Sequence, residues 1–123
     1  MSKEGMKNKL KRFGEEFGKI LEPVEFLKEK NPDLCSAFLE LHELTLNEGE
    51  LSKKHKFLIH AAVTASQHNL EATYMHILGA VNAGASEQEL LETSFTLIPV
   101  SGMPAFAVFL NALKRLKEAK NES

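Results

Sequence analysis

Apolar residues recur at intervals of three and four along most of this chain, which is the spacing of amphipathic helices. The alternating runs of β-branched residues that indicate strands are missing from the sequence. The first apolar stripe predicts a helix that ends at Pro23, because proline interrupts helical hydrogen bonding. That stripe consists of Met6, Leu10, Phe13, Phe17, Ile20 and Leu21.

Three further helical segments follow in the first half of the chain. A short turn of helix is expected over residues 24–28, and Asn31 followed by Pro32 is typical of a cap and first turn. The helix that begins there is expected to end near residues 47–49 and to bury Leu34, Cys35, Phe38, Leu39 and Leu46. Ser52 begins another helix to about Gln67, whose apolar residues cover most of its circumference, as is typical of a central core helix.

The second half continues in the same way. His68 and Asn69 interrupt the pattern, a helix follows over residues 70–83, and Ala83-Gly84 gives a glycine end signal. Ser86 and Glu89 form a capping box that begins a helix to about Leu97. Pro99, Gly102 and Pro104 predict a loop before a last helix that carries Phe106, Phe109, Leu110, Leu113 and Leu116. We therefore predict one all-α domain of about six helices.

Composition narrows the class of protein without indicating its chemistry. The 123 residues carry 15 basic and 17 acidic side chains, and this near-neutral balance gives no reason to expect nucleic acid or an acidic membrane as a partner. The start lacks the apolar stretch of a signal peptide, and the apolar run over residues 97–110 is too short to span a bilayer. A cytoplasmic location is expected. The single cysteine, Cys35, excludes an internal disulfide and a four-cysteine zinc site.

A narrow polar stripe runs along the predicted helix that begins at Ser52. It consists of Lys53, Lys56, His60, Thr64 and Gln67. Such a stripe either faces solvent, which is the favoured interpretation, or lines a polar pocket inside an oligomer. His60 and His68 each lie four residues from Thr64, and with no acidic neighbour they make a poor metal site. No metal site is predicted.

His76 lies on a helix face that otherwise carries only small residues. They are Ala72, Thr73, Gly79, Ala80 and Ala83. Small side chains let a ligand or another backbone approach closely, and histidine exchanges protons near neutral pH. We expect a small apolar pocket beside His76. The alternative, which local sequence alone favours, is a histidine that is hydrogen-bonded at a contact between helices.

The lone Cys35 lies on an apolar stripe with Phe38, Leu39 and Leu46. Buried cysteines are common and usually unreactive, so packing is the favoured role. A peroxidatic role would need a lowered thiol pKa and a second, resolving thiol.

Residues 36–118 resemble the carboxymuconolactone decarboxylase family, which includes the alkylhydroperoxidase-D-like proteins. The matching features are the opening L-S-K-K at Leu51, the apolar residues that follow it, His76, the segment N-A-G-A-S from Asn82, and the turn G-x-P-A at Gly102. The resemblance implies an alkylhydroperoxidase-D-like helical fold that assembles into homotrimers or homohexamers. We divide the chain accordingly into an amphipathic helical extension over residues 1–30 and a family domain over residues 31–120.

The resemblance implies different chemistry in two branches of the family. The peroxidase branch uses the motif E-x11-C-x-x-C-x-x-x-H, which is matched here only at His76. Phe57, Asn69 and Ala72 stand at the glutamate and the two cysteine positions. Without a thiolate no sulfur nucleophile is available to attack a peroxide, so thiol-peroxidase or peroxiredoxin-type activity is the less favoured alternative.

The decarboxylase branch lacks the cysteine pair too, and it implies a lyase that uses neither metal nor organic cofactor. The hypothesis is that such an enzyme acts here on a small carboxylated lactone or related acid, with His76 as the proton-transfer residue. His60 and Thr64 are the other candidate catalytic residues, and Asn69, His68 and Tyr74 are candidates for substrate binding. The alternative is a non-enzymatic oligomeric relative that has lost the chemistry.

Overall fold

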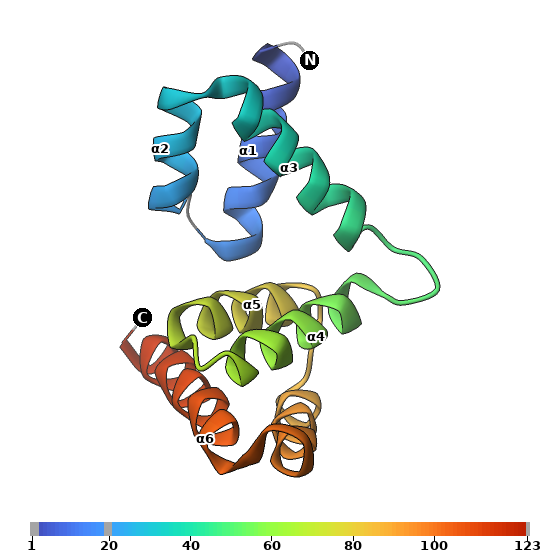
Figure 1. The fold of residues 1–123 in the computed structure, drawn as a ribbon, viewed down its shortest axis with the longest axis vertical. Coiled ribbons are helices and arrows are strands. Elements are labelled where there is room, and N and C mark those ends of the chain that lie inside the picture. The colour runs from blue at the N-terminus through green and yellow to red at the C-terminus, as the bar shows by residue number, and fades with distance from the viewer. Residues whose placement is uncertain (1–2, 19–20, 123) are drawn as a thin grey trace. The chain divides into compact units, whose positions relative to one another are not determined.

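The computed structural model describes residues 3–18 and 21–122, so Ile20 of the predicted first stripe lies outside the described residues. All six elements in the described part of the chain are α-helices, and the all-α prediction is confirmed. The helices fall into two compact units, Met1–Asn47 and Glu48–Ser123 (Figure 1).

The first unit contains α1 (Lys3–Phe17), α2 (Glu22–Lys30) and α3 (Pro32–Leu46). The prediction that Pro23 ends the first helix is wrong. Helix α1 ends at Phe17, and Gly18 follows with a left-handed φ of 81°. Pro23 instead lies in the first turn of α2, where the missing amide hydrogen costs nothing because the first amides of a helix have no partner in it.

Helix α3 begins as the sequence predicts, because the Asn31 side chain accepts a hydrogen bond from the Leu34 amide at 3.1 Å. Cys35, Leu39 and Leu46 are buried, but the predicted burial of two other residues is wrong. Leu34 is 52% exposed and Phe38 is 37% exposed, since α1 and α2 are the only helices of this unit that pack on α3.

Aromatic rings and ion pairs hold α1 against α3. The Phe13 ring packs edge-on against Phe17, Phe38 and His42, with its centroid 4.9 Å from that of His42. His42 Nε2 lies 2.7 Å from the Glu16 carboxylate in the same partly buried cluster. The Arg12 guanidinium adds a two-pronged contact to the Glu43 carboxylate.

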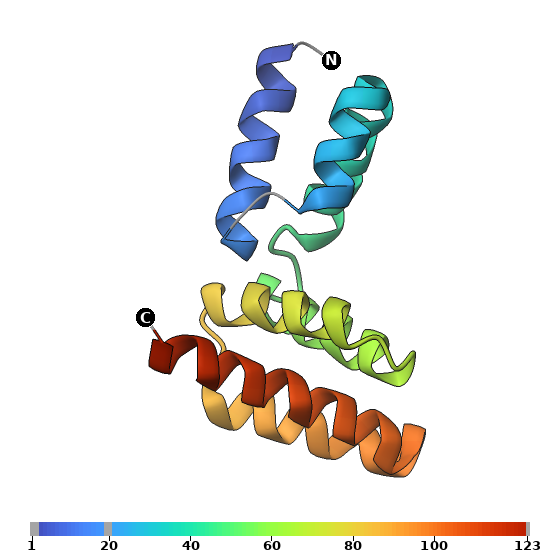
Figure 2. The same cartoon turned by 90° about the vertical axis from the view of Figure 1, so that its left-hand side faces the viewer.

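The second unit contains α4 (Lys53–Ser66), α5 (Leu70–Asn82) and α6 (Glu87–Glu122), and each helix packs on the other two. The predicted loop over residues 99–104 is not present. Helical structure continues through Pro99 and is broken only at Gly102, whose φ of 81° and ψ of 174° lie outside the helical region. The chain reverses direction between the two arms of α6 at this point (Figure 2).

Small buried residues form much of the core of this unit. They include Ala61 and Ala65 on α4, Ala80 on α5, and Ala105 and Ala112 on α6. The expectation that α4 is a central core helix is met on one face only. Phe57, Ala61 and Ala65 are buried, but Ile59 is 48% exposed and Val63 is 51% exposed.

Helix α6 carries an apolar stretch that bears on the predicted absence of a membrane span. By length and composition alone, Glu87–Asn121 is apolar enough to cross a membrane, with a mean hydropathy of 1.6 in its best window. Core helices of globular proteins pass the same test, and α6 supplies Leu97, Phe109 and Leu116 to the core of its unit. Much of its remaining apolar surface is exposed, Val100 by 83%.

Candidate functional site

The structure brings together two of the candidate catalytic residues, His60 of α4 and His76 of α5. Their ring centroids lie 5.1 Å apart, and the rings meet nearly at right angles, with 83° between their planes. Both side chains are half-buried, and the Nδ1 atom of His76 is completely buried. Positive charge on both imidazoles at this distance would be repelled, and histidine is the side chain that most readily exchanges a proton near neutral pH.

The contact between α4 and α5 fixes the histidines in register. One turn further along α4, the Thr64 hydroxyl lies 3.0 Å from the Thr73 hydroxyl of α5. Thr64 Oγ1 also lies within hydrogen-bond distance of the His60 and Ala61 carbonyls, at 3.0 and 3.2 Å. Thr64 is therefore engaged in holding the two helices together next to the histidine pair, and its catalytic role stays a prediction.

The face of small residues beside His76 accommodates a ring from the neighbouring helix. Gly79 is buried, and a Cβ added there would come within 2.5–2.8 Å of three carbon atoms of the Phe57 ring. The absence of a side chain at Gly79 thus lets Phe57 pack against the α5 backbone. Much of the space that the sequence assigned to a small apolar pocket is filled by this ring.

The three candidate substrate-binding residues lie in the turn after α4 and in the α5 region that follows it. His68 is exposed in the turn between α4 and α5, with a left-handed φ of 60°. The Asn69 side chain caps α5 by accepting a hydrogen bond from the Ala72 amide at 3.0 Å. Tyr74 lies on the opposite face of α5 from His76, where the Arg115 guanidinium of α6 stacks 4.3 Å from its ring centroid. Their roles in binding stay predictions.

Cys35 lies in the other unit and is fully buried, with its sulfur 4.0 Å from the Val24 carbonyl oxygen. Burial raises the pKa of the thiol, which favours the unreactive protonated form. Among residues 3–18 and 21–122, no group of three His, Cys, Asp or Glu side chains lies close enough to hold a metal ion.

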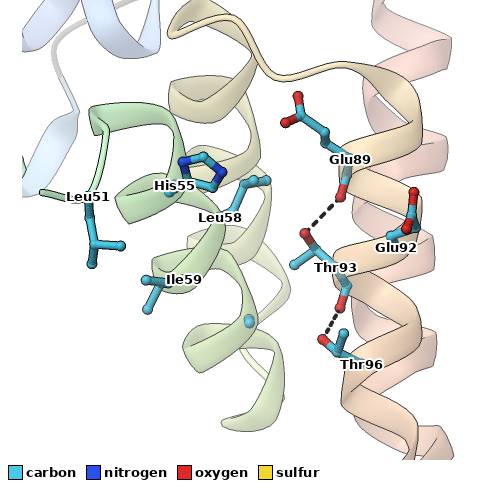
Figure 3. A pocket seen from close by; sticks show the side chains of 9 residues that line it. Leu51, His55, Leu58, Ile59, Glu89, Glu92, Thr93 and Thr96 are labelled. Atoms are coloured by element: carbon cyan, nitrogen blue, oxygen red, sulfur yellow. Dashed lines mark hydrogen bonds between the residues drawn. The ribbon is translucent and has the colours of Figure 1, made fainter.

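Sequence reasoning did not find a groove between α4 and the first arm of α6 (Figure 3). Its volume is about 470 Å³, and it lies on the face of α4 opposite His60. It is lined by Leu51, His55, Leu58, Ile59, Ala62, Glu89, Glu92, Thr93 and Thr96. One signal could have indicated it: four polar residues follow one another at helical spacing from Glu89 to Thr96.

Comparison with known families identifies the chain. The model of the carboxymuconolactone decarboxylase family matches residues 32–115. The chain belongs to the carboxymuconolactone decarboxylase family. The predicted resemblance is therefore confirmed, and the family match includes α3 in addition to the whole of α4 and α5.

A solved structure of similar fold supports the assignment. It is a crystal structure described as a "putative carboxymuconolactone decarboxylase" from Burkholderia xenovorans LB400, with a TM-score of 0.78 and 25% sequence identity. The similarity covers 100% of this chain and 99% of that one. A comparison with curated proteins gave no match.

Within the family, this chain has structural residues where the peroxidase motif has its glutamate and cysteines. Phe57 fills the space above Gly79, and Asn69 caps α5 through the amide of Ala72. None of these three side chains can form a thiolate or a carboxylate. Of that motif only His76 is kept, and its ring contacts that of His60 on α4.

Proposed function

We propose that this family member is a cofactor-independent lyase that acts on a small carboxylated lactone or a related acid. His76 is its proton-transfer residue and His60 the partner that relays the proton. The observation that carries the proposal is the contact of the two imidazole rings at 5.1 Å, within a half-buried part of the α4–α5 interface.

Two lysines on α4 place positive charge near the His60–His76 pair, which favours a substrate that carries a carboxylate. Lys53 and Lys56 lie on the same face of the helix as His60, and Lys56 precedes it by one turn. A substrate carboxylate held by Lys56 would place the adjacent carbon near the imidazoles. The chain's two arginines are bound by carboxylates elsewhere, Arg12 by Glu43 and Arg115 by Glu71.

Decarboxylation needs one proton, and the histidine pair can supply it. When the bond to the carboxylate carbon breaks, carbon dioxide leaves and the electron pair stays on the substrate, where a neighbouring carbonyl holds it as an enolate. A protonated His76 donates its proton to form the new C–H bond and becomes neutral. It then recovers a proton from solvent through His60, so the protein returns to its starting state.

Replacement of His76 by alanine tests this proposal most directly. With 4-carboxymuconolactone and related lactone acids as substrates, carbon dioxide release by His76→Ala should fall by about 10²–10⁴-fold. The exposed residue His55, on the other face of α4, provides the control, and His55→Ala should keep full activity. Unchanged turnover in His76→Ala, with an unaltered helical circular dichroism spectrum, would exclude His76 as the proton donor.

A non-enzymatic, self-assembling protein is the second candidate, and exposed apolar side chains favour it. On α3 Leu41 is 61% and Leu44 is 66% exposed, and on α6 Val100 is 83% and Met103 is 59% exposed. Such surface is typical of contacts between protein chains. We propose that copies of this chain assemble into a homotrimer or homohexamer through surfaces of this kind.

Analytical ultracentrifugation tests the assembly, and together with the lyase assay it separates the two candidate functions. The chain should sediment as a trimer or hexamer, and Val100→Glu or Leu44→Glu should shift the mass toward the monomer. Glu118→Gln, at an exposed position of α6, is the control and should leave the assembly intact. An assembly without lyase activity on any lactone acid would favour the non-enzymatic candidate, whereas a monomeric native chain would contradict the assembly.

A further inference from the structure

The groove between α4 and the first arm of α6 has two chemically different walls. The α4 side is mainly apolar and presents Leu58, Ile59 and Ala62, with Leu51 and the His55 imidazole at one end. The α6 side is polar and presents Glu89, Glu92, Thr93 and Thr96 (Figure 3). A volume of about 470 Å³ lies within the range of small-molecule sites.

The two threonines of the polar wall act as hydrogen-bond acceptors. Thr93 donates its hydroxyl proton to the Glu89 carbonyl oxygen at 2.7 Å, and Thr96 donates to the Thr93 carbonyl oxygen at 2.6 Å (Figure 3). A hydroxyl has one proton and two acceptor lone pairs, so each oxygen can still accept a hydrogen bond from a ligand.

The two carboxylates of this wall differ in their contacts with positively charged groups. Glu89 is neutralised locally, because its carboxylate lies 2.8 Å from Lys54 Nζ and accepts the Ser86 amide at 2.9 Å. Those contacts lower the pKa of Glu89 to about 2. Glu92 accepts only a neutral amide hydrogen bond among the contacts described for it, from Gln88 Nε2 at 3.1 Å, and it is exposed. The polar wall therefore carries a net negative charge, and that charge lies at Glu92.

We propose that this groove binds a small amphipathic organic cation, such as a primary amine with an aromatic or branched alkyl body. The ammonium group donates to the Glu92 carboxylate, with the Thr96 hydroxyl oxygen one helical turn further along α6 as a second acceptor. The body of the ligand lies against Leu58 and Ile59. An ammonium group has three donors and no acceptor, which complements a wall that offers acceptors. An anion of the same shape is repelled by Glu92.

Three probes of one shape but different charge test the proposal on the full chain. 2-Phenylethylamine, 2-phenylethanol and 3-phenylpropanoate are each titrated against ¹⁵N-labelled protein. The amine should shift the amide signals of Ile59 and Thr96, and the alcohol and the carboxylate should bind at least tenfold more weakly. Equal binding of the three probes, or no shift with the amine, would overturn the proposal.

Substitutions on the polar wall separate charge recognition from simple apolar binding. Glu92→Gln keeps the size of the side chain, and amine affinity should fall by about tenfold or more, because a charge-assisted hydrogen bond is lost. Thr96→Val removes an acceptor and should weaken binding by a smaller factor. The matched control is Glu118→Gln, an exposed carboxylate on the second arm of α6, which should leave affinity unchanged.

The groove and the histidine pair lie on opposite faces of α4, so the two proposals can fail separately. His76→Ala should bind 2-phenylethylamine as the native chain does, and Glu92→Gln should keep any lyase activity. Amine binding that is lost in His76→Ala and kept in Glu92→Gln would contradict the assignment of the groove.

Discussion

The two units of this chain hold their helices together by different means. In residues 48–123 the helices approach closely because the contacts are made by alanines, a glycine and single large rings such as Phe57 and Phe109. In residues 1–47 a cluster of aromatic rings joins α1 to α3, bordered by the contact of His42 with Glu16 and the ion pair of Arg12 with Glu43.

This difference predicts that the two units respond differently to changes in side-chain volume. Close packing of small residues leaves no space for added atoms and does not depend on charge, so the second unit should respond strongly to changes in volume. Ion pairs that are partly exposed contribute little and are screened by salt. They join helices in both units, as Arg12 with Glu43 in the first and Lys54 with Glu89 in the second, so each unit should respond modestly to pH and ionic strength. The candidate lyase site lies in the unit whose geometry is fixed by packing.

The largest effect is expected from removal of the Phe57 ring. Phe57 is completely buried, and Phe57→Ala should lower the free energy of unfolding by about 3–5 kcal/mol, measured by urea denaturation. The matched control is Phe95→Ala, since the Phe95 side chain is 49% exposed. An equal loss of unfolding free energy in both variants would show that the buried Phe57 contributes no more to stability than the half-exposed Phe95.

A smaller effect is expected when one methyl group is added at the same contact. Gly79→Ala would place a Cβ within 2.8 Å of the Phe57 ring, which must then move, and the free energy of unfolding should fall by about 1–3 kcal/mol. At Gly49 the nearest atom to an added Cβ is Lys56 Nζ at 3.9 Å, so Gly49→Ala is the control. Thermal unfolding of both variants measures the difference, and a stable Gly79→Ala would argue that the α4–α5 contact is adaptable.

Local chemistry in the sequence predicted the starts of several helices well. Asn31, Ser52 and the pair of Ser86 and Glu89 act as the caps that their residue types indicate. Pro23 and Gly102 were misjudged because a proline is compatible with both the start and the end of a helix, and a single left-handed glycine is enough to turn the chain. Which of these alternatives occurs depends on packing at a distance along the sequence.

The site could be predicted only in part for the same reason. Helical spacing placed His60 and His76 each on a definite face, but their contact depends on the register between α4 and α5. That register is set by the fit of Phe57 on Gly79, which no pattern within one helix reveals. The groove also escaped prediction, since its two walls come from helices that are well separated along the chain.

Removal of a helix cap should lower the free energy of unfolding by about the same amount in either unit, because a cap acts locally. Asn31 caps α3 in the first unit, and Asn69 caps α5 in the second. Asn31→Ala and Asn69→Ala should each lower stability by about 1 kcal/mol in chemical denaturation. The exposed Asn111, in the interior of the second arm of α6, provides the control. Asn111→Ala should change stability less than either cap variant, because its side chain lies away from the unpaired amides at a helix start.

The smallest effect, and the one that tests the charge side of the comparison, is expected for Glu43. The hydrogen bond from Arg12 lowers the pKa of the Glu43 carboxyl below its ordinary value of 4.5. A carboxyl with a lower pKa in the folded than in the unfolded chain stabilises the fold above its unfolded pKa, and this contribution disappears as the pH falls through the folded value. Glu43→Gln should therefore lose stability at pH 7 and none at the lowest pH, and the loss should shrink in high salt. Hydrogen exchange of α1 amides between pH 7 and acid measures it in the first unit. Equal destabilisation by Glu43→Gln at every pH and salt concentration would show that packing, and not charge, holds α1 against α3. The first unit would then be held together in the same way as the second.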